Sequence, residues 1–100
     1  MKLQAQYFID KDELFQDQQL SDFVLRFLLE NHIEGATLFV GRSGYGKHQV
    51  VKRPNEWFSF DETPVVITFV DEADKVEVVV RKLRDLIPSG FLITHPVTVW

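Results

Sequence analysis

The chain has 100 residues, the size of one small domain, and we expect residues 1–100 to fold as a single unit. Its net charge of −4 argues against a general nucleic-acid-binding protein, and its lack of cysteine excludes disulfides, cysteine-based zinc sites and thiol catalysis. Its sequence predicts neither a signal peptide nor a membrane-inserted segment, so we expect a cytoplasmic protein.

The first predicted element is a strand at the amino terminus. Apolar or aromatic residues at every second position, Leu3, Ala5, Tyr7 and Ile9, alternate with Lys2, Gln4, Gln6 and Phe8. This period of two is typical of a strand with one buried face. Residues 10–19, DKDELFQDQQ, follow as an acidic connector that is too polar for the core apart from Leu14 and Phe15.

The next segment predicts a helix, with Ser21 as its N-cap. Four apolar residues recur at helical spacing: Leu20, Val24, Phe27 and Leu28. Gly35 is expected to supply the left-handed residue that stops this helix.

Two further strands are predicted in the middle of the chain. Residues 36–40, ATLFV, form the first of them and lead directly into a glycine-rich segment. Residues 48–61 mix β-forming residues with a Pro-Asn break, which indicates an excursion from the sheet. Residues 64–70, PVVITFV, are almost continuously apolar, as is typical of a strand at the centre of a sheet.

A second helix and a last strand complete the predicted elements. Asp71 is expected to be the N-cap of the helix. Its apolar stripe consists of Val76, Val79, Val80, Leu83 and Ile87. Residues 88–90, Pro-Ser-Gly, end the helix, and residues 91–100 form the strand.

The resulting order, β-α-β-β-α-β, predicts an α+β ferredoxin-like fold, with a four-stranded antiparallel sheet and two helices on one face. Pro96 supports this assignment, because proline is tolerated mainly on edge strands and the fourth strand of this fold lies at an edge.

The segment GRSGYGKHQ, residues 41–49, nearly matches a phosphate-binding P-loop. It satisfies G-x-x-x-x-G-K, but His48 replaces the hydroxyl residue that binds magnesium. The segment after Lys47 is extended and contains Pro54, so it does not begin the helix that a P-loop requires. We therefore exclude a nucleotide-hydrolysing P-loop.

Two interpretations of this segment stay open from the residues alone. Its glycines permit a tight hairpin turn, but the surrounding basic residues also favour an anion site. Arg42, Lys47, Lys52 and Arg53 place four basic residues, with no acidic residue, in a span of twelve. In an acidic chain, this segment is the one that should attract a phosphate.

The histidines and the aromatic residues of the excursion do not form a recognisable site. His32, His48 and His95 are isolated in the sequence, so a metal site would require them to converge in space. Residues 57–60 hold Trp57, Phe58 and Phe60, a cluster that favours a contact with another subunit or a partner protein.

Three segments carry a resemblance to a known family. They are IEGATLFVGRSGYGKH at 33–48, ETPVVITFVDEADKVEVVVRKLRDLI at 62–87, and SGFLITHPVTVW at 89–100. Together they closely resemble the PII-like family called domain of unknown function 190. Where that family commonly has a Gly-Glu-Asp-like turn after its first strand, this chain has Asp10-Lys11-Asp12-Glu13.

The resemblance implies a regulatory homotrimer that binds a small anionic effector, an adenine nucleotide, in clefts between subunits. Residues 42–61 would be the loop that contacts a partner protein, such as a transporter or an enzyme. The implied ligand-binding residues are Arg42, Gly44, Tyr45, Gly46, Lys47, His48, Ser89 and Gly90. We expect no required cofactor, no metal ligand, no catalytic residue and no nucleic-acid partner.

Two alternatives to this reading stay open. The chain could be a small enzyme that acts on a phosphorylated metabolite. It could also be a divalent-cation-binding trimer that resembles the divalent-cation-tolerance proteins.

Overall fold

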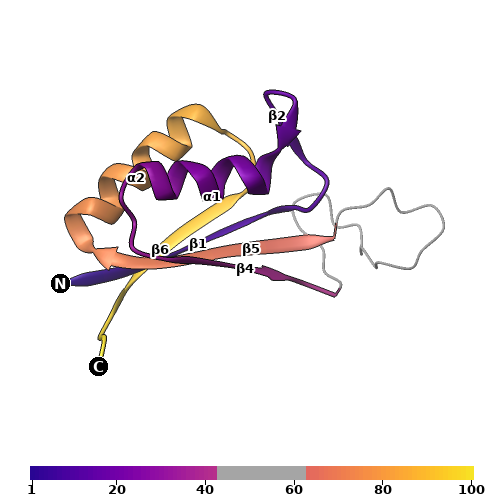
Figure 1. Ribbon diagram of the computed structural model, residues 1–100. Helices are drawn as coiled ribbons and strands as arrows, with labels where there is room; N and C mark the ends of the chain where they lie inside the picture. Colours follow the sequence, from indigo (N-terminus) through magenta and orange to yellow (C-terminus); the bar gives the residue numbers. More distant parts are fainter. Residues whose placement is uncertain (43–62) are drawn as a thin grey trace.

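The computed structural model describes residues 1–42 and 63–100 (Figure 1). In this part of the chain a four-stranded antiparallel sheet has the strand order β4-β5-β1-β6, and both helices cover one face of it. The long elements are β1 (Lys2–Asp10), α1 (Leu20–Glu30), β4 (Ala36–Val40), β5 (Pro64–Glu72), α2 (Ala73–Leu86) and β6 (Phe91–Val97). The predicted ferredoxin-like fold is confirmed.

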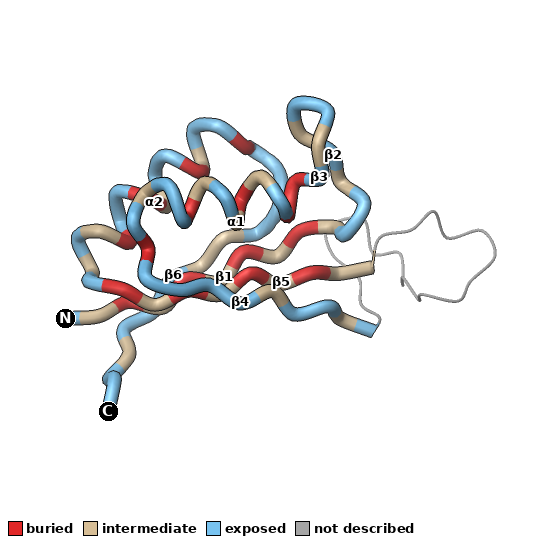
Figure 2. The backbone as a smooth tube through the Cα atoms, viewed as in Figure 1, coloured by how far each residue is buried: buried red, intermediate tan, exposed pale blue. Residues whose placement is uncertain are grey.

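The central strands β1 and β5 bury one face each. Along β1 the odd-numbered residues from Leu3 to Ile9 are buried and their neighbours are half-buried, as the period of two predicts. In β5 the same alternation runs from Val65 to Asp71, although the sequence is almost continuously apolar. The reason is that both helices lie on one face of the sheet (Figure 1), and Figure 2 shows buried and less buried residues alternating along these strands.

The core lies between this face and the two helices. Helix α1 contributes Leu20, Val24 and Leu28, and helix α2 contributes Val76, Val79 and Leu83. These sets recur at the helical period, so each helix presents one apolar stripe to the sheet. Strand β6 lies at an edge of the described sheet, with Pro96 opposite Leu3, which confirms the prediction made from this proline.

The segment predicted as an acidic connector contains a small hairpin, β2 (Leu14–Phe15) and β3 (Gln18–Gln19). Its two turn residues, Gln16 and Asp17, have positive φ angles of 52° and 63°. Tight hairpins need positive φ at both central positions, which usually selects Asn-Gly or Asp-Gly. Gln16-Asp17 lacks that signature, so the turn could not be predicted from its residues.

The predicted N-cap of α1 is wrong. Ser21 is buried within the helix, which begins one residue earlier, and no side chain in the described part of the chain caps the Gln19 position. Instead, the amide of Leu20 donates to the carbonyl oxygen of Glu13 at 2.8 Å. A backbone acceptor in the preceding turn therefore satisfies a helix-start amide, and a side-chain cap is unnecessary there.

The predicted helix stop at Gly35 is also wrong, because His32 adopts the left-handed conformation, with φ of 65°. The His32 amide donates to Leu29 and the Ile33 amide donates to Leu28, both at 3.1 Å. This pair of bonds is a Schellman motif, which ends the helix before Gly35 is reached. His32 thus satisfies a terminal carbonyl through its backbone.

Asp71 is not the N-cap of α2, because it lies within β5 and Glu72 occupies the capping position. The buried Asp71 carboxylate instead accepts from the Glu72 amide at 2.8 Å, the Glu34 amide at 3.1 Å and the Lys75 ammonium at 3.2 Å. Burial acts to raise the pKa of Asp71, but these hydrogen bonds and the Lys75 charge outweigh it and lower that pKa. Asp71 therefore ties the segment before β4 to the start of α2.

Candidate functional site

One end of the sheet gathers four segments that are distant in the sequence. Strand β1 ends there with Asp10 opposite Pro64, the first residue of β5. The Lys11 amide donates to Thr63 at 2.8 Å, and the Gly41 amide donates to Pro64 at 2.7 Å. We call this region, which comprises residues 10–13, 41–42, 63–64 and 88–90, the turn end of the sheet (Figure 1).

Three of the predicted ligand-binding residues are in the described part of the chain, and all three lie at the turn end. Arg42 follows β4, and Ser89 and Gly90 precede β6; each is exposed. The other predicted ligand residues, Gly44, Tyr45, Gly46, Lys47 and His48, lie outside the described residues, as do Trp57, Phe58 and Phe60. The same holds for most of the predicted partner loop 42–61.

The described residues of this predicted site are divided between the two edges of the sheet. Arg42 extends from edge strand β4, whereas Ser89 and Gly90 lead into the opposite edge strand β6. Three strand spacings separate these edges, a distance of about 14 Å. The described part of the predicted site is thus split between opposite edges of the described sheet.

The turn at residues 88–90 is shaped by close packing on β1. Gly90 has φ of +82°, and a Cβ added there would lie 2.5 Å from Cε1 of Tyr7. The Tyr7 hydroxyl donates to the carbonyl oxygen of Ser89 at 2.8 Å. Burial raises the pKa of Tyr7 to about 12; the Arg84 charge acts to lower it, and Glu13 adds to the rise. Gly90 is thus required for packing, a role that its assignment as a ligand residue did not include.

Arg84, in the last turn of α2, fixes the same turn from the other side. Its guanidinium donates to the carbonyl oxygen of Pro88 at 2.9 Å and reaches those of Ser89 and Gly90 at 3.4 and 3.5 Å. It also lies 5.6 Å from the centre of the Tyr7 ring. Arg84 therefore compensates the carbonyl groups at the helix end, where a cation is favourable.

The side chain of Ser89 has a partner that the sequence did not reveal. Its hydroxyl donates to the carboxylate of Glu13, 76 residues away in the chain. No local pattern connects these two residues. Arg84, in contrast, had a weak signal in the sequence, because it is a basic residue just before a helix-ending proline.

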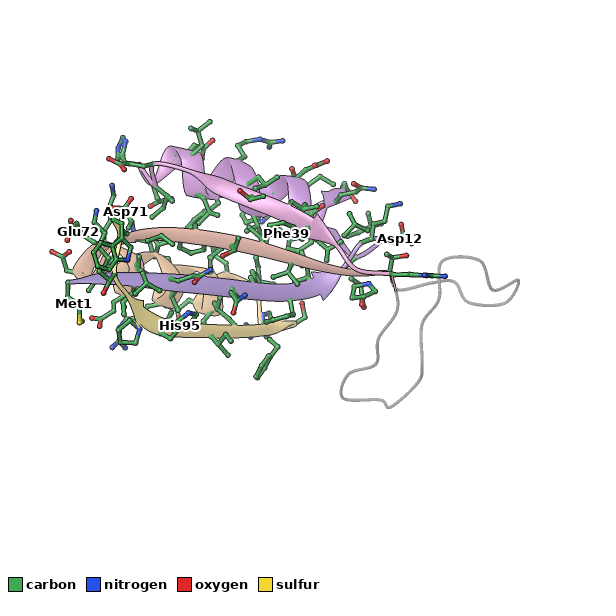
Figure 3. All side chains as sticks on the ribbon, turned by 90° about the horizontal axis from the view of Figure 1, so that it is seen from below. Met1, Asp12, Phe39, Asp71, Glu72 and His95 are labelled. Atoms are coloured by element: carbon green, nitrogen blue, oxygen red, sulfur yellow. The ribbon has the colours of Figure 1, made fainter. Side chains whose placement is uncertain are left out.

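Figure 3 shows the neighbouring Asp12 at this end of the sheet and Asp71 and Glu72 at the opposite end.

The histidines do not form a metal site within the described structure. His32 is exposed after α1, and His95 is exposed on β6 opposite Gln4 (Figure 3). Among residues 1–42 and 63–100, no three side chains of the metal-binding types lie close enough to hold an ion. His48 lies outside these ranges.

None of the helices within residues 1–42 and 63–100 has the length and apolar character that a membrane crossing requires.

The fold, with its two edge strands and its turn end, is that of PII-like proteins. CPII from Thiomonas intermedia K12, a nitrogen regulatory PII-like protein solved with ADP, AMP and acetate, matches with a TM-score of 0.71 at 16% identity. The match covers 99% of this chain and 88% of CPII. The divalent ion tolerance protein CutA1 from Ehrlichia chaffeensis matches with a TM-score of 0.67 at 16% identity, over 99% of this chain and 83% of CutA1. At these identities the likeness shows the fold alone.

The sequence comparison is more specific. The family DUF190, described as "Uncharacterized ACR", matches residues 3–99, so the chain belongs to this family. A UPF0166 protein from Aquifex aeolicus (strain VF5) is 27% identical over 77 residues, which are 77% of this chain and 73% of that protein. The resemblance recognised in the sequence is confirmed.

Proposed function

We propose that this protein is a PII-like regulatory protein that acts as a homotrimer in the cytoplasm and binds an adenine nucleotide between its subunits. Residues 42–61 contact a partner protein, a transporter or an enzyme, and nucleotide binding alters that contact. In this proposal the chain has no catalytic residue, and the nucleotide acts as an effector.

The observation that carries the proposal is the division of the predicted site between two edges of one sheet. Arg42 and Ser89 lie at the same end of the molecule, yet they adjoin opposite edge strands of the described sheet, which are three strand spacings, about 14 Å, apart. A second copy that brings its β4 edge beside the β6 edge of the first would place the two residues on one ligand. Such a head-to-tail contact closes into a ring of three when each copy is related to the next by a rotation of one third of a turn.

The open face of the sheet supports assembly. A row of apolar side chains crosses the sheet on the face away from the helices, because Phe39 is opposite Val66, Val66 opposite Phe8, and Phe8 opposite Phe91. Phe39 and Phe91 are 58% and 64% exposed. Contiguous exposed apolar surface marks interaction sites, and further copies of the chain would cover this row.

The identity of the effector is supported by chemistry and by likeness. Residues 41–53 combine glycines with basic side chains and have no acidic residue, which suits a phosphate-bearing ligand. CPII, which shares the fold, was solved with ADP and AMP. We infer that Lys47 and Arg42 supply the positive charge, while Gly44, Tyr45, Gly46, His48, Ser89 and Gly90 complete the ligand contacts.

A thermal-shift panel of ATP, ADP, AMP, cyclic nucleotides and divalent metals, with turnover measured in parallel, tests this function. A ligand at one hundred times its dissociation constant stabilises the protein by roughly 2.7 kcal/mol, a clear shift. We expect ADP or ATP to produce it without turnover. A shift with metals alone would favour the cation-binding alternative, product formation would favour an enzyme, and no shift with any nucleotide would contradict the proposal.

Two variants locate the site within this experiment. Lys47→Ala and Arg42→Ala should each weaken nucleotide binding about tenfold, because each removes a charge-assisted contact with a phosphate. Arg81→Ala is the matched control, since Arg81 is exposed on α2 and is not among the predicted ligand residues. Equal affinities for all three variants would show that the nucleotide binds elsewhere.

A further inference from the structure

The Ser89 hydroxyl already has an acceptor within the chain. It donates its hydrogen to the Glu13 carboxylate, which reaches it from the turn after β1. A serine hydroxyl has one hydrogen to donate, so the same group cannot also donate to a phosphate while this bond is formed. The carboxylate in addition places a negative charge where an anion would approach.

Two side chains outside this turn donate to its carbonyl oxygens. The Arg84 guanidinium donates to the carbonyl oxygens of Pro88 and Ser89, and the Tyr7 hydroxyl donates to Ser89 as well. These bonds fix the backbone of the turn. They do not move the Glu13 carboxylate, which stays beside the Ser89 hydroxyl. The Glu13 carboxylate therefore opposes the approach of an anion to the Ser89 hydroxyl until it moves.

Glu13 is also the residue that closes the root of the β2–β3 hairpin. Its amide donates to Asp10 at 3.2 Å, and its carbonyl oxygen accepts from the Leu20 amide at 2.8 Å. Phe15, two residues further on, packs against Phe23 of α1 with ring centres 4.6 Å apart. The bond from Ser89 to the Glu13 side chain therefore adds an anchor between this root and the turn at residues 88–90, and displacement of the side chain releases that anchor.

The geometry points to Glu13 as an internal competitor for the anion position at Ser89, and therefore as a specificity-determining residue of this site. An anionic ligand reaches the Ser89 hydroxyl by displacing the Glu13 carboxylate, and this displacement loosens the β2–β3 hairpin. The inference rests on the proposed function for the identity of the ligand, ADP, but the Glu13–Ser89 bond is independent of it.

Titration calorimetry with ADP tests the competition. Glu13→Gln removes the charge with little change of shape, and it should tighten ADP binding by about three- to thirtyfold, the effect of one nearby charge. Asp12→Asn makes the same charge change at the neighbouring exposed position and should alter affinity less than about twofold. Equal affinities of Glu13→Gln and Asp12→Asn would overturn the inference, whereas absence of ADP binding in the wild type and in every variant would contradict the proposed function.

Hydrogen exchange without ligand tests the Glu13–Ser89 bond directly. It therefore distinguishes failure of this inference from failure of the proposed function. Ser89→Ala removes the donor and should accelerate exchange of the Leu20 amide about fivefold, the effect of losing one ordinary hydrogen bond. Glu13→Ala should do the same, and Asp12→Asn should leave the rate unchanged. Unchanged exchange in Ser89→Ala and Glu13→Ala would overturn the inference whatever the result with ADP.

Discussion

The hydroxyl of Tyr7, in the buried face of β1, donates to the carbonyl oxygen of Ser89 in the turn before β6 at 2.8 Å. This bond joins the centre of the sheet to the turn that we place in the ligand site. A substitution of Tyr7 should therefore alter both the stability of the fold and the position of Ser89.

Tyr7→Phe should lower the free energy of unfolding by about 1 kcal/mol, because it leaves the Ser89 carbonyl without this donor and changes little else in the core. Urea unfolding measures the effect. Tyr45→Phe is the matched control, as it makes the same chemical change at the other tyrosine of the chain. A loss below about 0.3 kcal/mol would mean that solvent replaces the bond without cost.

The stabilisation from Tyr7 should also depend on pH. Its pKa is raised to about 12 in the folded protein, whereas an unfolded tyrosine titrates near 10. The contribution is therefore complete below pH 10 and is lost as the pH rises toward 12, because the unfolded chain releases this proton first. Unfolding free energies of wild type and Tyr7→Phe should converge over that range; a constant difference would contradict the raised pKa.

Gly90→Ala should be among the most damaging single methyl additions in the described structure. The residue has φ of +82°, and an added Cβ would lie 2.5 Å from Tyr7 Cε1 and 2.9 Å from the Phe8 carbonyl oxygen. Backbone strain and overpacking together should cost about 2–4 kcal/mol.

Gly35→Ala is the control for this prediction. A Cβ added at Gly35 would meet no atom of the described residues within 4 Å, and this glycine does not have a positive φ. It should leave the stability unchanged or raise it by up to about 1 kcal/mol, since alanine restricts the unfolded chain. Similar losses in Gly35→Ala and Gly90→Ala, measured by urea unfolding, would show that the close contacts at Gly90 are relieved by movement of the turn.

The arrangement of the strands and helices could be predicted because burial imposes a period on the sequence. Leu3 to Ile9 and Val76 to Leu83 show the periods of two and 3.6 that one covered face of a sheet and one buried stripe of a helix require. The edge position of β6 could be predicted from Pro96, which lacks an amide to donate. Each of these patterns can be recognised within a single strand or helix, without knowledge of its partners elsewhere in the chain.

The capping residues and the site could be predicted only in part, since their partners come from elsewhere in the chain. Asp71 reads as a helix cap, but the amide of Glu34, 37 residues away, captures one of its oxygens. Ser89 was assigned to the site by resemblance, and nothing near it in the sequence reveals that Glu13 accepts from its hydroxyl. The helices and strands could thus be predicted from the periodic parts of the sequence. The hydrogen-bond partners at the turn end could not, because they come together only in the folded chain.

Phe39→Asp should dissociate the proposed trimer. Phe39 is 58% exposed at the β4 end of the apolar row on the open face of the sheet (Figure 3), and a carboxylate there would have to lose its water on assembly. Sedimentation equilibrium at micromolar concentration should give three chain masses for the wild type and one for the variant. Leu29→Asp introduces the same charge at a 72% exposed leucine on α1 and should retain the wild-type mass, because α1 covers the other face. A wild-type monomer would remove the cleft between subunits, and a trimeric Phe39→Asp would move the interface away from the open face of the sheet.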